Sequence, residues 1–155
     1  KTVGDALDVA LCNAIRLING TLRVYGARSL SGDDVNFRYI TGQDTVNSVV
    51  TKANNALEDL IFNVIDGRGS IFSDVEAKLK AILEPLRNSG ALYEAFDANG
   101  KRIDAGYTIV CNSSNNPVTQ LATGLVKASV GMRVSSVGDK IEVDIVKSNL
   151  TNSVV

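Results

Sequence analysis

Apolar residues recur with a helical period over the first part of this chain and with the alternating period of β-strands over its last third. The segment "VGDALDVALCNAIRLING" carries a first apolar stripe and is predicted to form a helix that stops at Gly20. This stripe consists of Leu7, Leu11, Ile15 and Ile18. A strand over residues 21–25 and a short extended piece over residues 36–41 are predicted to follow.

The most regular stripe lies between residues 46 and 61 and predicts a long amphipathic helix. Its apolar positions, separated by Asn, Lys and Glu, are Val46, Val49, Val50, Ala53, Leu57, Leu60 and Ile61. Either Asp44 or Thr45 can cap the free amide groups at the start of this helix. The segment "NVIDGRGSIF" is predicted to be a loop between helices.

A second long helix is predicted to begin at a capping box formed by Ser73 and Glu76. Its buried stripe consists of Val75, Leu79, Ile82, Leu83 and Leu86. Pro85 falls in the last turn, where it should bend or end the helix, and Gly90 closes it.

The remaining segments are predicted to be strands. "LYEAF" leads into the Asn-Gly hairpin turn "DANG", "YTIVC" forms a compact buried strand, and "LVKASVGMRV" alternates strictly. Helices and strands thus mix, with the strands concentrated toward the end of the chain. The economical fold class is α/β, an α+β sandwich in which two main helices pack on one mostly antiparallel sheet.

The segment "KIEVDIV", residues 140–146, follows the hinge "SSVGDK" and is predicted to be an extended C-terminal strand. One face consists of Ile141, Val143 and Ile145, and the other of Lys140, Glu142 and Asp144. Such an exposed strand is an aggregation hazard unless it pairs with another strand. We therefore divide the chain into an α/β domain, residues 1–138, and a C-terminal strand and arm, residues 139–155. Because the chain opens on Lys1 rather than Met, it is expected to be a fragment of a longer subunit.

Composition restricts the classes of partner. The chain has 155 residues, enough for one domain, and its 16 basic and 17 acidic residues give a net charge of −1. A nucleic-acid surface needs a clear basic excess, so no nucleic-acid partner is expected. No apolar run approaches the roughly 18 residues of a membrane span, so no direct membrane insertion is expected. Cys12 and Cys111 match no metal pattern and are predicted to be reduced core residues in a cytoplasmic setting.

Candidate catalytic groups are few. The chain has no histidine, which excludes Ser-His and Cys-His catalysis within it. Asp33 and Asp34 are adjacent, so their side chains diverge in an extended segment and are expected to be solvated turn residues. The segment from Asp97 to Thr108 lacks the ligands of a calcium loop, and "DGRGS" lacks the Lys-Ser/Thr of a phosphate loop. No enzymatic activity, cofactor or metal is therefore predicted.

Three arginines cluster around the strand at residues 21–25 and the loop after it: Arg23, Arg28 and Arg38. Arginine can clamp phosphate, so the alternative function is a small α/β enzyme or ligand-binding domain for a phosphorylated metabolite that also uses Asp33 and Asp34. Carboxylates in the same loop favour instead ion pairs and hydrogen bonds that hold the loop in place. Gly26 allows the sharp turn, and Gly26, Arg28 and Arg38 are therefore predicted to be structural loop anchors.

Three short motifs, "NAIR" at 13–16, "VYGARSL" at 24–30 and "FRYI" at 37–40, follow one another along the chain. They resemble motifs of the C-terminal domain of contractile phage tail sheath proteins and of related injection-system sheaths. The family has an Ile-Asn-x-Ile-Arg run, a Val-Trp-Gly-Ala-Arg-Thr-Leu strand and an aromatic-Arg-Tyr-Ile segment. Tyr25 stands for the Trp and Ser29 for the Thr. The resemblance implies that residues 11–17 are extended, whereas periodicity favours a helix there.

The resemblance implies a mechanical rather than a chemical role. It implies a structural subunit of a contractile tail sheath, which polymerises around the tail tube and drives it through the target envelope on contraction. The expected partners are other copies of the sheath subunit and the tail tube protein. The expected location is the contractile tail of a virion, assembled in the bacterial host cytoplasm. Sheath subunits add terminal strands to their neighbours' sheets, so Ile141, Val143 and Ile145 are expected to belong to an inter-subunit strand.

Overall fold

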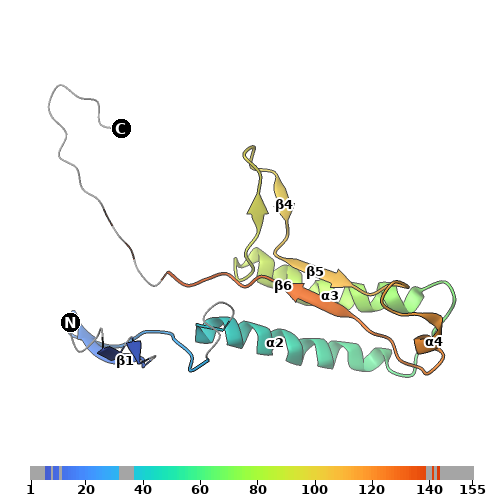
Figure 1. The fold of residues 1–155 in the computed structure, drawn as a ribbon, viewed down its shortest axis with the longest axis horizontal. Helices are drawn as coiled ribbons and strands as arrows, with labels where there is room; N and C mark the ends of the chain where they lie inside the picture. Colours follow the sequence, from blue (N-terminus) through green and yellow to red (C-terminus); the bar gives the residue numbers. More distant parts are fainter. Residues whose placement is uncertain are drawn as a thin grey trace.

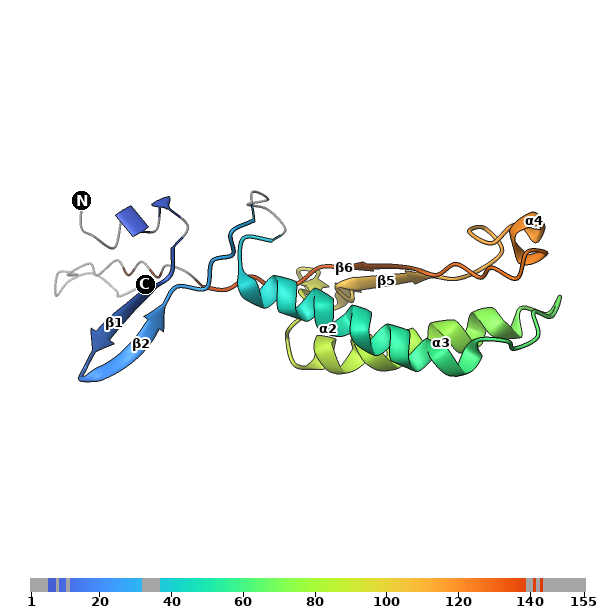
Figure 2. The ribbon, with the colours of Figure 1, turned by 90° about the horizontal axis from the view of Figure 1, so that it is seen from below.

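The computed structural model describes residues 6, 7, 9, 10, 12–31, 37–138, 141 and 143. Two long helices, α2 (Ile40–Leu57) and α3 (Ser70–Asn88), lie side by side, and a strand pair, β5 (Tyr107–Val110) and β6 (Ser129–Met132), runs along them (Figure 1). Seen from below, the helices form one layer and the strand pair forms a second (Figure 2). This mixture of helices and antiparallel strands confirms the predicted α+β class.

The apolar core lies between these two layers. Its buried residues form two clusters: Val49, Leu83 and Leu92, and then Val75, Leu79 and Cys111. Leu83 of α3 is completely inaccessible to solvent. Ile109 of β5 and Val130 of β6 contact both clusters and join them into one core. The predicted stripe of the second long helix is thus confirmed at the positions that face the strands.

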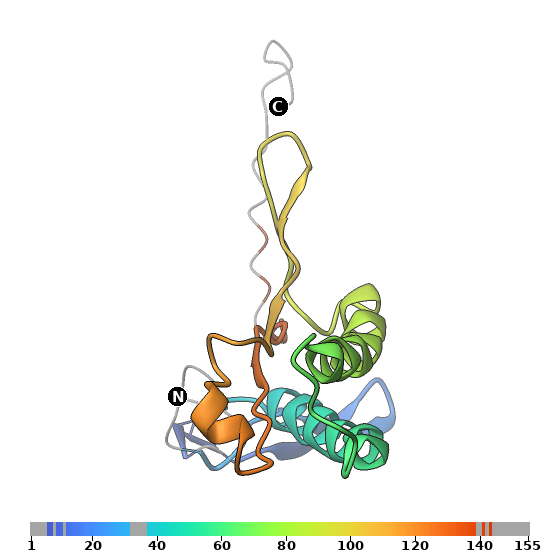
Figure 3. The same ribbon diagram turned by 90° about the vertical axis from the view of Figure 1, so that its right-hand side faces the viewer.

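The strands of the described residues form three two-stranded antiparallel sheets, so the prediction of a single sheet is wrong. The pairs are β1 (Ala14–Ile18) with β2 (Thr21–Tyr25), β3 (Ala95–Phe96) with β4 (Arg102–Asp104), and β5 with β6. The β3–β4 hairpin shifts register between Ala95 and Phe96 and projects away from the two layers (Figure 3). Its turn is the predicted "DANG", where the Asp97 carboxylate accepts hydrogen bonds from the amides of Asn99 and Lys101 at 2.9 and 2.8 Å.

Helix α2 begins earlier than predicted and without a side-chain cap. Tyr39 pairs with Arg28 in an isolated β-bridge, and the helix starts at the next residue. Thr45, a predicted cap, instead donates its hydroxyl to the carbonyl of Thr41 at 2.8 Å. The predicted extended piece therefore ends at Tyr39, because tertiary pairing fixes that boundary. The helix continues into a short 3₁₀ turn, η1 (Glu58–Leu60).

Helix α3 also begins before its predicted capping box. It starts at Ser70, after Gly69 in a left-handed conformation. The Ser70 amide donates to the carboxylate of Asp66 at 3.0 Å, so Asp66 provides the cap that was expected of Ser73. Pro85 lies in the last turn, as predicted, and Gly90 closes the helix with φ of +77°.

The prediction of a helix over the first apolar stripe is wrong for residues 14–18, which form β1. Of the described residues in that stretch, only Ala6, Leu7 and Val9 are helical. Asn19 and Gly20, with φ of 50° and 76°, form a two-residue turn between β1 and β2. This left-handed Asn-Gly pair reverses the chain where the periodicity predicted the end of a helix.

The strand predicted over residues 125–134 is shortened to β6, and a buried asparagine explains why it begins late. Asn116 is 1% exposed, and its amide oxygen accepts the Lys127 amide at 2.6 Å while its Nδ2 donates to the Lys127 carbonyl at 2.9 Å. These bonds occupy the main chain of Lys127, which therefore does not pair with β5. They also fix the loop that contains the short helix α4 (Val118–Leu121).

Candidate inter-subunit hairpin

The β1–β2 hairpin has an apolar face that is open to solvent. Register pairs Ile15 with Val24 and Leu17 with Leu22, so these side chains share one face. Their exposed fractions are 72% and 70% for the first pair, and 69% and 71% for the second. The hairpin lies beyond the start of α2, away from the two layers (Figures 1 and 2). We refer to these four residues as the hairpin apolar face.

The opposite face of the hairpin is basic. Arg16 and Arg23 stand directly opposite one another in the register, where like charges repel. The Arg16 guanidinium lies 4.8 Å from the ring centroid of Tyr25, a diagonal neighbour on the same face. Within the described part of the chain, no carboxylate forms an ion pair with either arginine. We refer to Arg16 and Arg23 as the arginine face.

The hairpin has the features of an incomplete sheet. An isolated two-stranded hairpin is at best marginally stable in water. Both outer edges of β1 and β2 are without a neighbouring strand among the described residues. Such edges present unpaired main-chain groups, and contiguous exposed apolar side chains mark interaction surfaces. The hairpin therefore has the geometry of an acceptor for a further strand.

An anchor built around Asn13 holds the base of the hairpin. The Asn13 side-chain oxygen accepts the Arg28 amide at 2.9 Å, and its Nδ2 donates to the Arg28 carbonyl at 2.9 Å. The side-chain amide thus bonds the main chain of Arg28 as a neighbouring strand would. Gly26 lies against it with φ of +132°, and a Cβ at Gly26 would come within 2.6 Å of Asn13 Oδ1. Only glycine fits this position.

The anchor continues from Arg28 to the start of α2. Arg28 and Tyr39 form the isolated bridge, in which the Ser29 amide donates to the Arg38 carbonyl at 2.9 Å. The Ser29 hydroxyl also donates to the carbonyl of Phe37. The Arg38 guanidinium lies 5.6 Å from the ring centroid of Tyr39. Hydrogen bonds therefore link the hairpin base to the first turn of the helix.

The predicted loop anchors Gly26, Arg28 and Arg38 all lie in this region, and their role in holding the loop stays a prediction. Asn13 was not among the predicted anchors, although it belongs to the "NAIR" motif. Arg23 lies instead on the arginine face, so the three arginines do not form one cluster. This separation does not favour the phosphate-clamp alternative. Asp33 and Asp34 lie outside the described residues.

The predicted inter-subunit strand is described at only two of its positions. Ile141 is 87% exposed and Val143 is 73% exposed. Ile145 lies outside the described residues. The assignment of these three residues to a strand shared between subunits stays a prediction.

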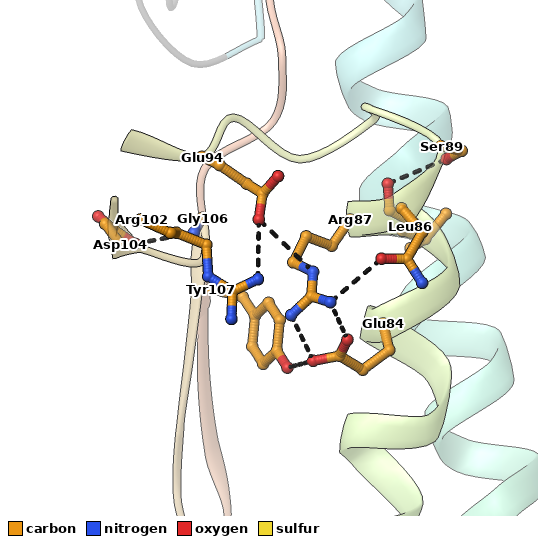
Figure 4. Close-up of polar contacts among 10 residues, drawn as sticks. Glu84, Leu86, Arg87, Ser89, Glu94, Arg102, Asp104, Gly106 and Tyr107 are labelled. Carbon is orange, nitrogen blue, oxygen red and sulfur yellow. Dashed lines mark hydrogen bonds and ion pairs between the residues drawn. The ribbon is translucent and has the colours of Figure 1, made fainter. Parts of the chain in front are cut away.

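A second polar cluster lies where α3 ends, beside the β3–β4 hairpin (Figure 4). The Tyr107 hydroxyl donates to Glu84, and Arg87 Nη1 donates to the same carboxylate at 2.9 Å. The Glu94 carboxylate lies 3.5 Å from Arg87 Nε and 3.2 Å from Arg102 Nη1. This alternation of charges ties the helix to the projecting hairpin.

The pKa shifts of Glu84 and Tyr107 are those of a hydrogen bond that supports the fold. The hydrogen bond from Tyr107, with the charge of Arg87, lowers the pKa of Glu84. Burial and the hydrogen bond to Glu84 raise the pKa of Tyr107. Both shifts keep the carboxylate ionised and the phenol protonated at neutral pH, whereas a catalytic acid or base has its pKa near the working pH.

The remaining candidates are the two cysteines and possible metal ligands, and those that the structure describes do not come together in one site. Cys111 is buried, but Cys12 is exposed, so the prediction that both cysteines are core residues is wrong for Cys12, which precedes the exposed hairpin. In the described part of the chain, no group of three or more His, Cys, Asp or Glu residues could hold a metal ion. Among the same residues, no helix combines the length and the apolar character that a membrane span requires.

The fold is shared with chains of two solved assemblies. No protein-family model and no curated protein matches the sequence. A chain of the anti-feeding prophage (AFP) baseplate matches with a TM-score of 0.76 and 18% identity, over 96% of this chain and 40% of that chain. A chain of the PVC sheath complex, an extracellular contractile injection system in its contracted state, matches with a TM-score of 0.76 and 21% identity. This match covers 96% of the present chain and 41% of that chain. At these identities the similarity establishes the fold, and the present chain spans about 40% of the length of the two chains it matches.

Proposed function

We propose that this chain is part of a structural subunit of a contractile sheath, in a phage tail or a related injection system. The subunit polymerises with other copies around a tail tube, drives the tube through the target envelope on contraction, and performs no catalysis. The observation that carries the proposal is the β1–β2 hairpin, with its exposed apolar face and two open edges. The shared fold with chains of baseplate and sheath assemblies supports the same class of function.

The strand that completes the hairpin comes from the C-terminal segment, residues 139–155, of a neighbouring copy. Ile141 and Val143 are highly exposed, so neither is buried in the core of its own chain. The alternating stretch at residues 141–145 equals β1 and β2 in length, at five residues. Its apolar side chains can extend the hairpin apolar face while its main chain pairs with an open edge.

Strand addition suits a lattice that changes shape. Main-chain hydrogen bonds between strands persist during a rigid-body rotation when the connecting segments bend. The hairpin is joined to the body through the anchor at Arg28, and the segment containing Gly138 precedes the arm. The partners are other copies of the subunit and the tail tube protein. The assembly takes place in the bacterial cytoplasm, and the product is a particle-associated tail.

Deletion of residues 139–155 from the full-length protein tests this function. The truncated subunit should remain soluble and folded, with unchanged circular dichroism, and negative-stain electron microscopy should show no tubes. A matched deletion of residues 147–155 leaves the alternating stretch intact and should still give striated tubes. Tubes from the larger deletion would contradict strand exchange, and unfolding of that variant would place the strand in its own core. Discrete particles from the undeleted protein would favour the small enzyme or ligand-binding alternative.

A further inference from the structure

The two faces of the β1–β2 hairpin differ in chemistry, so a strand added at either edge meets two different rows of side chains. One row is the hairpin apolar face, and the other is the arginine face. Alternate residues of the added strand extend each row. Each strand carries one arginine on the second face, so a strand that fits must be apolar at every second position and carry an acidic residue between them that reaches the arginine.

The C-terminal segment of the chain has this complementary pattern. Residues 141, 143 and 145 are Ile, Val and Ile, and the residues between them are Glu142 and Asp144. Because the side-chain period of a strand is two, aligning the apolar residues with the hairpin apolar face puts both carboxylates on the arginine face. This holds at the β1 edge, next to Arg16, and at the β2 edge, next to Arg23.

Charge and hydrophobicity select the same alignment. A slip of one residue would turn Glu142 and Asp144 toward the apolar face and put apolar side chains beside the arginines. In the free hairpin, Arg16 and Arg23 repel one another across the strands. A neighbouring carboxylate replaces that repulsion with an attractive cross-strand pair, so the acidic strand is favoured over a neutral one.

We infer that Arg16 and Arg23 recognise Glu142 and Asp144 of a second copy of this chain and thereby determine which strand is accepted and in which alignment. The inference rests on the proposed strand exchange and names its specificity-determining residues. These residues act by charge complementarity, which strengthens selection between partners more than it strengthens binding.

A charge exchange between two variants of the full 155-residue chain tests the inference. One variant carries Arg16→Glu and Arg23→Glu, and the other carries Glu142→Lys and Asp144→Lys. Each variant alone should self-associate about 10-fold more weakly than the unmodified chain in sedimentation velocity, because attractive pairs become like-charge pairs. An equimolar mixture should recover association to within about threefold, because each acceptor then meets an arm of opposite charge. Association of the unmodified chain should also weaken as salt is raised.

A matched control changes the same number of charges elsewhere. Lys52 and Lys101 are exposed on α2 and on the β3–β4 turn, so Lys52→Glu with Lys101→Glu should associate as the unmodified chain does. The arginine and lysine variants should keep the same melting temperature at concentrations too low for association, because all four side chains are exposed.

The outcomes distinguish the inference from the proposed function. If the unmodified chain associates and both charge variants associate equally well, or if the mixture fails to recover, the role of the arginines is overturned while strand exchange stands. If the unmodified chain does not associate at all, strand exchange fails and the inference fails with it.

Discussion

Replacing one exposed and one buried leucine by alanine should show that self-association and folding stability depend on different leucines. Leu83 of α3 is completely buried against α2 and the strands, whereas Leu22 on the hairpin apolar face is 71% exposed. Removing a fully buried leucine side chain leaves a cavity and costs about 3–5 kcal/mol. For a domain of this size, that lowers the melting temperature by roughly 10 °C. Leu22→Ala removes little burial within the chain, so its effect on unfolding should stay within about 0.5 kcal/mol.

Self-association, in contrast, should depend on Leu22. Burying a whole leucine side chain contributes about 1.5–3 kcal/mol. Since 71% of Leu22 remains to be covered, its burial against a partner contributes roughly 1–2 kcal/mol. Leu22→Ala should therefore weaken self-association by about 5- to 30-fold. Val118 on α4 is 80% exposed and away from the hairpin, so Val118→Ala is the matched control and should leave association unchanged.

Urea denaturation followed by circular dichroism measures the first effect, and sedimentation velocity measures the second. The reasoning would be refuted if Leu22→Ala lowered the urea midpoint as much as Leu83→Ala, because the hairpin would then pack on its own body. It would equally be refuted if Leu22→Ala associated as tightly as Val118→Ala, because the hairpin apolar face would then not be an interface.

Two further substitutions test the anchor and the polar tie. Gly26→Ala places a methyl group against Asn13 and should abolish protection of the Arg28 amide in hydrogen exchange. Gly20→Ala also adds a side chain at a positive φ, +76° against +132° at Gly26, but it meets open space and should leave that amide protected. Tyr107→Phe removes the hydrogen bond that lowers the pKa of Glu84. A carboxyl group whose pKa is lowered in the folded state stabilises the fold at pH values above its ordinary pKa, which is about 4.3. This stabilisation is lost as the pH falls through the pKa of the folded state. The melting temperature should thus fall less steeply below pH 5 in Tyr107→Phe than in the unmodified chain, and equal slopes would contradict the tie.

The long helices could be predicted because their apolar residues recur on the face that is buried inside the chain. Val75, Leu79 and Leu83 recur at helical spacing and all lie in the core. The boundaries could not be predicted from local caps, because distant or main-chain partners determine them. The start of α2 depends on the bridge between Arg28 and Tyr39, which are 11 positions apart in the sequence.

The strand predicted over residues 21–25 is confirmed as β2, and only β1, the first strand of the hairpin, differs from the predicted helix, for a different physical reason. Periodicity identifies the face that a segment buries against its own core, and the apolar face of β1 and β2 is not buried there. The spacing of Ile15 and Ile18 could therefore be extended backward into a helical stripe. The local signal was the Asn19-Gly20 pair, which is typical of a two-residue hairpin turn. At the anchor, Gly26 is among the residues predicted to hold the loop, whereas the hydrogen bonds from Asn13 depend on a contact across 15 residues that no local pattern indicates.

The proposed exchange has a consequence for the form of the assembly. The acceptor is the β1–β2 hairpin and the donor is the segment at residues 141–145, so the two halves of the interface are different surfaces of the chain. A heterologous interface of this kind propagates into rings or helices and does not close by pairing like with like. Each copy that joins leaves one open hairpin and one free arm at the ends of the growing chain.

The size distribution of the unmodified chain should therefore broaden and shift upward with concentration, which multi-angle light scattering measures directly. The Arg16→Glu/Arg23→Glu variant should need about 10-fold higher concentrations to reach the same sizes. A distribution that stopped at a dimer would show two copies exchanging arms reciprocally. In that closed dimer, both hairpins and both arms are paired and no further copy can join. This result would contradict the role of the exchange in building a sheath.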